Sequence, residues 1–60
     1  MSRNELFRHY QNFVSEHINL KDRAYIVLRA ALECLENGEK PDIVIDKMYF
    51  GLNIIKGGVL

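Results

Sequence analysis

The segment from Ile43 to Ile55 constrains the fold of this sequence most, because it is apolar over an unusually large part of its surface. If the segment is helical, its neighbouring polar residues fall along one narrow side, namely Asp42, Asp46, Asn53 and Lys56. A helix that is apolar around most of its circumference is normally enclosed by other elements. The rest of the chain must therefore cover this segment, or leave part of it for another molecule.

The chain is short, and this limits how much of that surface it can cover. Its 60 residues are enough for one domain, and we expect residues 1–60 to form a single helical domain. A domain of this size buries only about 60% of the surface that its unfolded chain exposes. Cys34 is the only cysteine, so no disulfide can form within the chain. Good packing and self-association remain as sources of stability, and we expect a helical homodimer.

The charge balance argues against nucleic acid as a partner. Eight basic residues offset eight acidic ones, which removes the positive field on which phosphate binding depends. Charged residues at positions 3, 5 and 8 interrupt the N-terminus, and no apolar run reaches the roughly 20 residues that span a bilayer. We expect no membrane contact. The single unpaired cysteine is typical of a reducing compartment, and we expect a cytoplasmic protein.

A first helix is predicted over residues 3–17. Ser2 and Glu5 have the spacing of a capping box, in which the serine hydroxyl accepts a backbone N–H of the first turn. Residues at spacings of three and four then form one apolar stripe: Leu6, Tyr10, Phe13, Val14 and His17. This stripe is the side of the helix that we expect to face the core.

A second helix is predicted over residues 21–37, with Asn19 as its N-cap and Asp22 in its first turn. Its buried face should be broad, because two apolar stripes lie side by side. One stripe comprises Tyr25, Leu28, Leu32 and Leu35, and the other comprises Ala24, Val27, Ala31 and Cys34. Asn37 and Gly38 tolerate the left-handed conformation in which many helices end.

A third helix is predicted over residues 42–55, and Pro41 suits its first turn. A short strand near residues 43–46 is the alternative, because three consecutive β-branched residues favour extended structure and Gly51 weakens a helix. The helical spacing of the polar side favours the helix. The fold class expected is therefore all-α with three short helices, and the alternative is α+β.

Two short helices can cover only one side of the third, so the rest of its apolar surface predicts a protein interface. In the expected homodimer, Met48, Leu52 and Ile55 are buried in the self-association core. Adjacent residues on a helix point about 100° apart, so either Tyr49 or Phe50 should face outward. The predicted interface residues are Met48, Tyr49, Phe50, Leu52, Ile54 and Ile55, and Val59 and Leu60 are expected to add to the exposed surface.

The residues that carry chemistry form no recognisable catalytic or metal site. Cys34 with His9 or His17 lacks both a third, orienting group and an oxyanion hole. The two histidines are about 80° apart around a helix, which does not suit a shared metal. The carboxylates are dispersed, and no glycine-rich phosphate loop precedes a helix. We expect no enzyme activity, no cofactor and no metal.

Two functions remain open from the sequence. The first is a small regulatory or inhibitory module that binds a larger protein through the hydrophobic face of its C-terminal helix. The alternative is a dimeric DNA-binding transcriptional regulator, because the second and third segments have roughly a helix-turn-helix layout. That alternative needs the basic residues of the first two helices to gather on one face of a dimer, and these residues are Arg3, Arg8, Lys21, Arg23 and Arg29.

Overall fold

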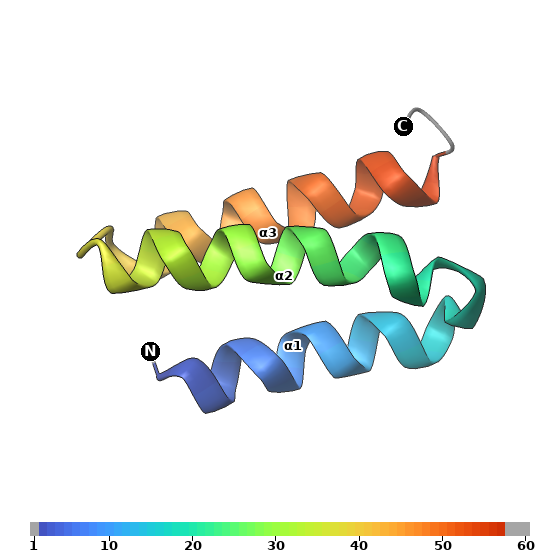
Figure 1. The fold of residues 1–60 in the computed structure, drawn as a ribbon, viewed down its shortest axis with the longest axis horizontal. Coiled ribbons are helices and arrows are strands. Elements are labelled where there is room, and N and C mark those ends of the chain that lie inside the picture. Colours follow the sequence, from blue (N-terminus) through green and yellow to red (C-terminus); the bar gives the residue numbers. More distant parts are fainter. Residues whose placement is uncertain (1, 58–60) are drawn as a thin grey trace.

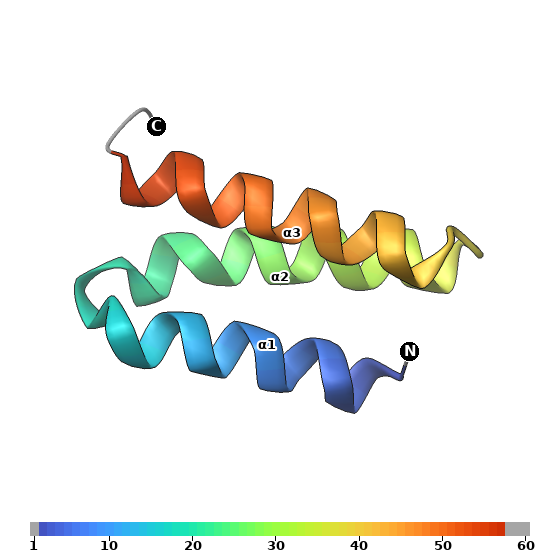
Figure 2. The same ribbon diagram turned by 180° about the vertical axis from the view of Figure 1, so that it is seen from behind.

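The computed structural model describes residues 2–57, which form three α-helices that lie side by side, each antiparallel to the one before it (Figure 1). The helices are α1 (Arg3–Glu16), α2 (Lys21–Glu36) and α3 (Pro41–Lys56). A short 3₁₀ turn, η1 (Ile18–Leu20), joins α1 to α2. The view from behind shows α3 lying across α2 with α1 below (Figure 2). The all-α prediction with three helices is confirmed.

α1 begins and ends close to the predicted positions. The Glu5 backbone N–H donates to Ser2 Oγ over 3.2 Å, so Ser2 is the N-cap as expected. The helix ends at Glu16, one residue earlier than predicted. His17 then folds back: its Nδ1 lies 3.0 Å from the Phe13 carbonyl oxygen, and the two rings stack with centroids 4.5 Å apart. Because a carbonyl only accepts, this nitrogen carries the proton.

The predicted N-cap of α2 is wrong. Asn19 lies within the 3₁₀ turn, and Leu20 occupies the N-cap position without a side-chain hydrogen bond. The turn uses its own backbone bonds instead, since the Leu20 N–H donates to the His17 carbonyl over 2.9 Å. The Tyr10 hydroxyl also donates to the Lys21 carbonyl over 3.2 Å, which ties the start of α2 to α1. Backbone and tertiary contacts therefore replace the side-chain cap.

The link between α2 and α3 follows the predicted pattern, with small shifts in the helix ends. α2 ends at Glu36, and Gly38 adopts a φ of 89°. The Glu39 N–H donates to the Cys34 carbonyl over 3.1 Å, which satisfies a carbonyl at the end of α2. Pro41 is the first residue of α3, one position before the predicted start.

The strand alternative for residues 43–46 is wrong, because α3 is helical from Pro41 to Lys56. One side of this helix is almost completely buried, and it consists of Val44, Met48, Leu52 and Ile55. These residues recur with helical spacing, so only a helix turns all of them toward the same neighbours. Burial of this side outweighs the β propensity of the first turn.

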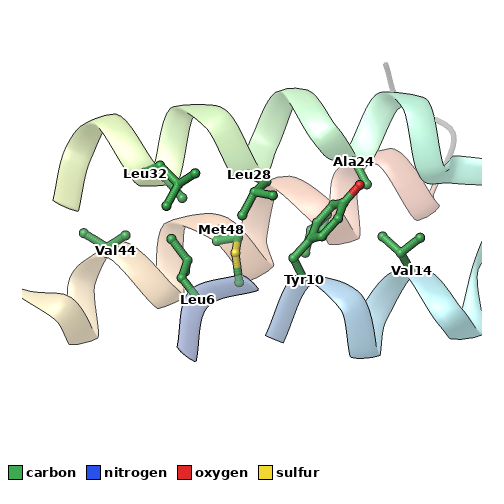
Figure 3. Close-up of a cluster of buried hydrophobic side chains, with 10 residues drawn as sticks. Leu6, Tyr10, Val14, Ala24, Leu28, Leu32, Val44 and Met48 are labelled. Carbon is green, nitrogen blue, oxygen red and sulfur yellow. The ribbon is translucent and has the colours of Figure 1, made fainter. Parts of the chain in front are cut away.

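The core lies between the three helices. Figure 3 shows Leu6, Leu28 and Met48 pointing toward one another, one from each helix. The predicted stripes of α1 and α2 are confirmed for most of their members, which are Leu6, Tyr10, Val14, Ala24, Leu28, Ala31 and Leu32. The other members are half-buried, namely Phe13, His17, Val27, Cys34 and Leu35, except Tyr25, which was expected in the core but is 51% exposed. It borders the groove between α1 and α2, where no further element covers it.

α2 and α3 approach each other closely where Gly51 faces Val27. A Cβ placed on Gly51 would lie only 3.0 Å from Val27 Cγ1. The absence of a side chain therefore lets the two helices approach, which explains a glycine in the middle of a helix that otherwise disfavours it.

Replacing Leu28 should unfold a large part of the protein. Leu28 is completely buried, and truncating such a residue to alanine costs about 2–5 kcal/mol. A 60-residue chain has a total stability of only about 3–9 kcal/mol. We expect Leu28→Ala to lower the urea midpoint sharply or to abolish the cooperative transition seen by circular dichroism. Ile18→Ala is the control, because Ile18 is 74% exposed; equal effects of the two changes would contradict the described core.

The contact between Gly51 and Val27 predicts a coupled pair. Gly51→Ala gains about 1 kcal/mol of helix propensity but crowds the Val27 methyl groups. We expect the change to stabilise a Val27→Ala background more than the wild type, and urea unfolding of all four proteins at one low concentration measures the difference. If Gly51→Ala has the same effect in both backgrounds, the close approach of the two helices is not as described.

Candidate protein-interaction face

One side of the helix pair α2 and α3 turns away from α1, and we call it the α2–α3 face. It consists of one stripe from each helix, in which residues recur every three or four positions. The stripe of α2 comprises Arg23, Val27, Ala30 and Cys34, and the stripe of α3 comprises Ile43, Lys47, Phe50 and Ile54. The contacts of α1 lie elsewhere, since His9 meets Tyr49 on another side of α3 and Tyr25 and Arg29 border α1 on another side of α2.

A groove runs along this face between the two helices. One part of it is lined by Val27, Ala30, Ala31, Cys34, Val44, Lys47 and Met48. A second part, toward the start of α2, is lined by Arg23, Ile26, Val27 and Ile55. Val27 belongs to both parts, so they adjoin. Most lining side chains are apolar, and Arg23 and Lys47 supply the only charges among them.

Large apolar side chains stand exposed beside this groove. Phe50 is 69% exposed and Ile43 is 45% exposed, both on α3. Ile26 of α2, at the edge of the face, is also 69% exposed. Single exposed apolar residues are normal on a protein surface, but several of them beside an apolar groove are typical of an interaction site.

The structure divides the six predicted interface residues into two sets. Met48, Leu52 and Ile55 are at most 2% exposed within one chain, so they belong to its own core and offer a partner no surface. Phe50 is exposed, and Tyr49 and Ile54 are half-buried. Whether these three contact a partner stays a prediction. Val59 and Leu60, also expected to be exposed, lie outside the described residues.

Of the two adjacent aromatic residues, Phe50 is the one that faces outward. Tyr49 turns toward α1, where its hydroxyl lies 2.8 Å from His9 Nδ1 and the two rings meet edge to face with centroids 5.7 Å apart. This pair links α1 to α3 and uses the polar atoms of both side chains. Tyr49 is therefore a structural residue first, and Phe50 is the better candidate for an interface anchor.

Sequence reasoning missed the contribution of α2 to the face. The signal was present in the second apolar stripe of this helix, which includes Val27 and Cys34. Two adjacent stripes indicated a broad buried surface, but they did not show that α1 and α3 would leave part of it uncovered. Only the arrangement of the helices determines which part remains accessible.

A small polar cluster lies at the end of the groove near the α2–α3 loop. Lys47 Nζ is 2.6 Å from Glu39 Oε1, and the Cys34 thiol hydrogen-bonds to the Glu39 carboxylate. That hydrogen bond, more than desolvation, raises the pKa of Cys34 above its ordinary value. The same bond, together with Lys47, lowers the pKa of Glu39. A raised thiol pKa disfavours the thiolate, so the surroundings of Cys34 are those of a packed side chain rather than a nucleophile.

The basic residues do not share one surface. Arg3 and Arg29 line the groove between α1 and α2, but Glu33 and Glu36 line it too, and Arg3 is 2.9 Å from Glu36. Arg23 lies on the α2–α3 face instead. Carboxylates thus interrupt the positive charge within a single chain, which weakens the argument for phosphate contacts.

Residues 2–57 lack two further features, a metal-binding cluster and a membrane-spanning helix. No group of three or more His, Cys, Asp and Glu side chains there is arranged to hold a metal ion. None of the helices described is long and apolar enough to cross a membrane.

Comparison of the chain with models of known families, with curated proteins and with solved structures finds no match.

The polar cluster predicts the reactivity of Cys34. Glu39→Gln removes the carboxylate that raises the thiol pKa and leaves the Lys47 charge, which lowers it, without its partner. We expect the pKa of Cys34 to fall and iodoacetamide to react several-fold faster with the variant at about pH 8. Glu33→Gln is the control, because Glu33 contributes least to the shift. Equal rates for the wild type and Glu39→Gln would mean that the carboxylate does not control the thiol.

Proposed function

We propose that this protein is a small regulatory or inhibitory interaction module that binds another protein through its α2–α3 face. The observation that carries this proposal is the exposure of Phe50 and Ile26 beside an apolar groove, although the chain completes a core without them. The exposure of apolar surface to water is unfavourable in free energy, and a partner that covers this surface removes the unfavourable contribution.

The shape of the face favours a helix as the bound element. α2 and α3 form the two sides of a shallow groove that runs along their axes, and small side chains such as Ala30 and Cys34 line it. An amphipathic helix fits such a groove by inserting residues spaced three and four apart. Lys47 and Arg23 border the groove, so acidic residues at the margin of the bound helix would meet opposite charge.

The exposed residues supply part of the binding free energy. Phe50 and Ile26 are each 69% exposed, so burial of the exposed part of both would contribute about 2–4 kcal/mol together. Association in solution costs at least about 4 kcal/mol in lost translational and rotational freedom. These two residues thus offset only part of the cost of association, and the partner must also fill the groove. The single cysteine, Cys34, fits a module that works in the reducing cytoplasm.

The DNA-binding alternative has less support. Arg3 is paired with Glu36, and Arg23 is separated from Arg3 and Arg29 on another face. The start of α3, which would have to read base edges, presents Asp42 and Asp46.

Substitution of Phe50 tests the proposed function. Phe50→Asp places a charge in the centre of the α2–α3 face without touching the core, and we expect it to abolish binding. Tagged protein is incubated with a lysate of the native host, captured proteins are identified by mass spectrometry, and each is purified and titrated directly. Asn12→Asp is the matched control, because Asn12 is exposed on α1. If a partner binds Phe50→Asp and wild type equally well, the face is not its binding site.

A further inference from the structure

We propose that a second copy of this chain occupies the α2–α3 face, with its helices antiparallel to those of the first copy and related to them by a two-fold axis. The axis lies between the two copies, at right angles to the helices. This inference rests on the proposed function, because it assigns a partner to the same face. Three properties of the face favour a second copy: its stripes, its charges and its area.

The stripe of α2 is complementary to itself when reversed. A two-fold axis requires a surface in which each residue meets a suitable residue of the same surface. If the axis passes between Val27 and Ala30, Val27 of each copy meets the smaller Ala30 of the other copy. Arg23 then lies opposite Cys34 at each end. Large side chains thus face small ones along α2, as ridge-into-groove packing requires.

The stripe of α3 is also complementary to itself when reversed. Reversal about the same axis places Ile43 opposite Ile54, which buries two apolar side chains at each end. It also places Lys47 opposite Phe50, where the aliphatic part of the lysine side chain can cover the aromatic ring while its ammonium stays bonded to Glu39. Phe50, the most exposed aromatic residue of the chain, is therefore covered by the second copy.

The charges at the two ends of the face are opposite in sign. Arg23 is exposed at the start of α2 and takes part in neither ion pair found among residues 2–57. Glu39 lies at the other end, beside Cys34, and its Oε1 is 2.6 Å from Lys47 Nζ. The antiparallel arrangement brings Arg23 of each copy to Glu39 of the other. The net charge of zero adds no long-range repulsion between copies.

The area of the face sets the expected affinity. α2 and α3 have 16 residues each, so each is about 24 Å long. Two such helices side by side present a face about 20 Å wide, or about 500 Å² per copy. The dimer would bury about 1,000 Å² in total, which is near the lower limit for a specific interface. We therefore expect reversible association in the micromolar range rather than a permanent dimer.

Sedimentation equilibrium of the purified chain tests the association. From about 1 μM to about 1 mM, the mass should rise from 7.0 kDa toward twice that value. Ala30→Glu places a charge at the centre of the interface at a position exposed in the monomer, and we expect dimerisation to weaken at least tenfold. Asn12→Glu, an exposed change on α1, should leave it intact. A mass that stays at 7.0 kDa throughout, with a cooperatively folded sample, overturns the inference.

A charge exchange tests the antiparallel pairing. Arg23→Glu and Glu39→Arg should each weaken the dimer roughly tenfold, because like charges then meet across the interface. The double variant should recover most of the affinity. Within one chain Glu39 lies beside Cys34, which is about 16 Å from Arg23 along α2. Arg23 and Glu39 of the same chain therefore cannot contact each other, and the recovery can only come from contacts between copies. Failure of the double variant to recover contradicts the proposed orientation.

An introduced cysteine gives a second test of geometry. In the proposed dimer Cys34 of one copy is about 16 Å from Cys34 of the other, too far for a disulfide. Arg23→Cys places a second thiol opposite the partner copy's Cys34. Mild oxidation should cross-link this variant into a dimer and leave the wild type monomeric on a denaturing gel. Efficient cross-linking of the wild type through Cys34 would overturn the antiparallel arrangement.

These results separate the inference from the proposed function. If the purified chain remains monomeric but Phe50→Asp loses a heterologous partner, the second copy is excluded and the interaction module stands. If the charge exchange and the cross-link both behave as expected, the second copy is established as an occupant of the face, whatever other proteins bind there.

Discussion

The packing of α2 between the other two helices is the interaction on which the whole structure depends. Leu28 is fully buried at the centre of the bundle, where Leu6 and Met48 reach it from α1 and α3. Small residues such as Ala24, together with Gly51 of α3 opposite Val27, let the backbones approach. A thin core of this kind leaves little excess stability, because a 60-residue chain buries only about 60% of the surface that it exposes when unfolded. Each buried contact of α2 therefore matters for the stability of both neighbours.

The same arrangement explains the exposed surface. Three helices in contact leave each helix with an outward side, and a helix needs polar residues there to remain soluble. α3 has only a narrow polar side, so its outward surface includes Ile43 and Phe50. α2 adds Val27, which lines the groove, and Ile26 at the edge of the face. The α2–α3 face is thus the direct result of two broadly apolar helices packed with too few neighbours.

Much of this organisation was predictable from local patterns. Ser2, Gly38 and Pro41 predicted helix ends to within one or two residues, because capping and turn chemistry depend on nearby backbone groups. The period of Val44, Met48 and Leu52 predicted a helix despite β-branched neighbours. Asn19 failed as a cap because the 3₁₀ turn used backbone bonds in its place. Tyr25 failed as a core residue because, unlike Leu28 and Leu32 of the same stripe, it lies at the margin of the contact with α1.

The sequence by itself determined that the chain is helical, where its helices begin and end, and that its last helix is too apolar for a solvated surface. The tertiary structure decided which apolar residues remain accessible. It buried Met48, Leu52 and Ile55 within one chain, turned Tyr49 toward His9, and left Phe50 outside. The physical reason is that periodicity fixes the side of a helix on which a residue lies, whereas the number and placement of neighbouring helices fix which sides are covered.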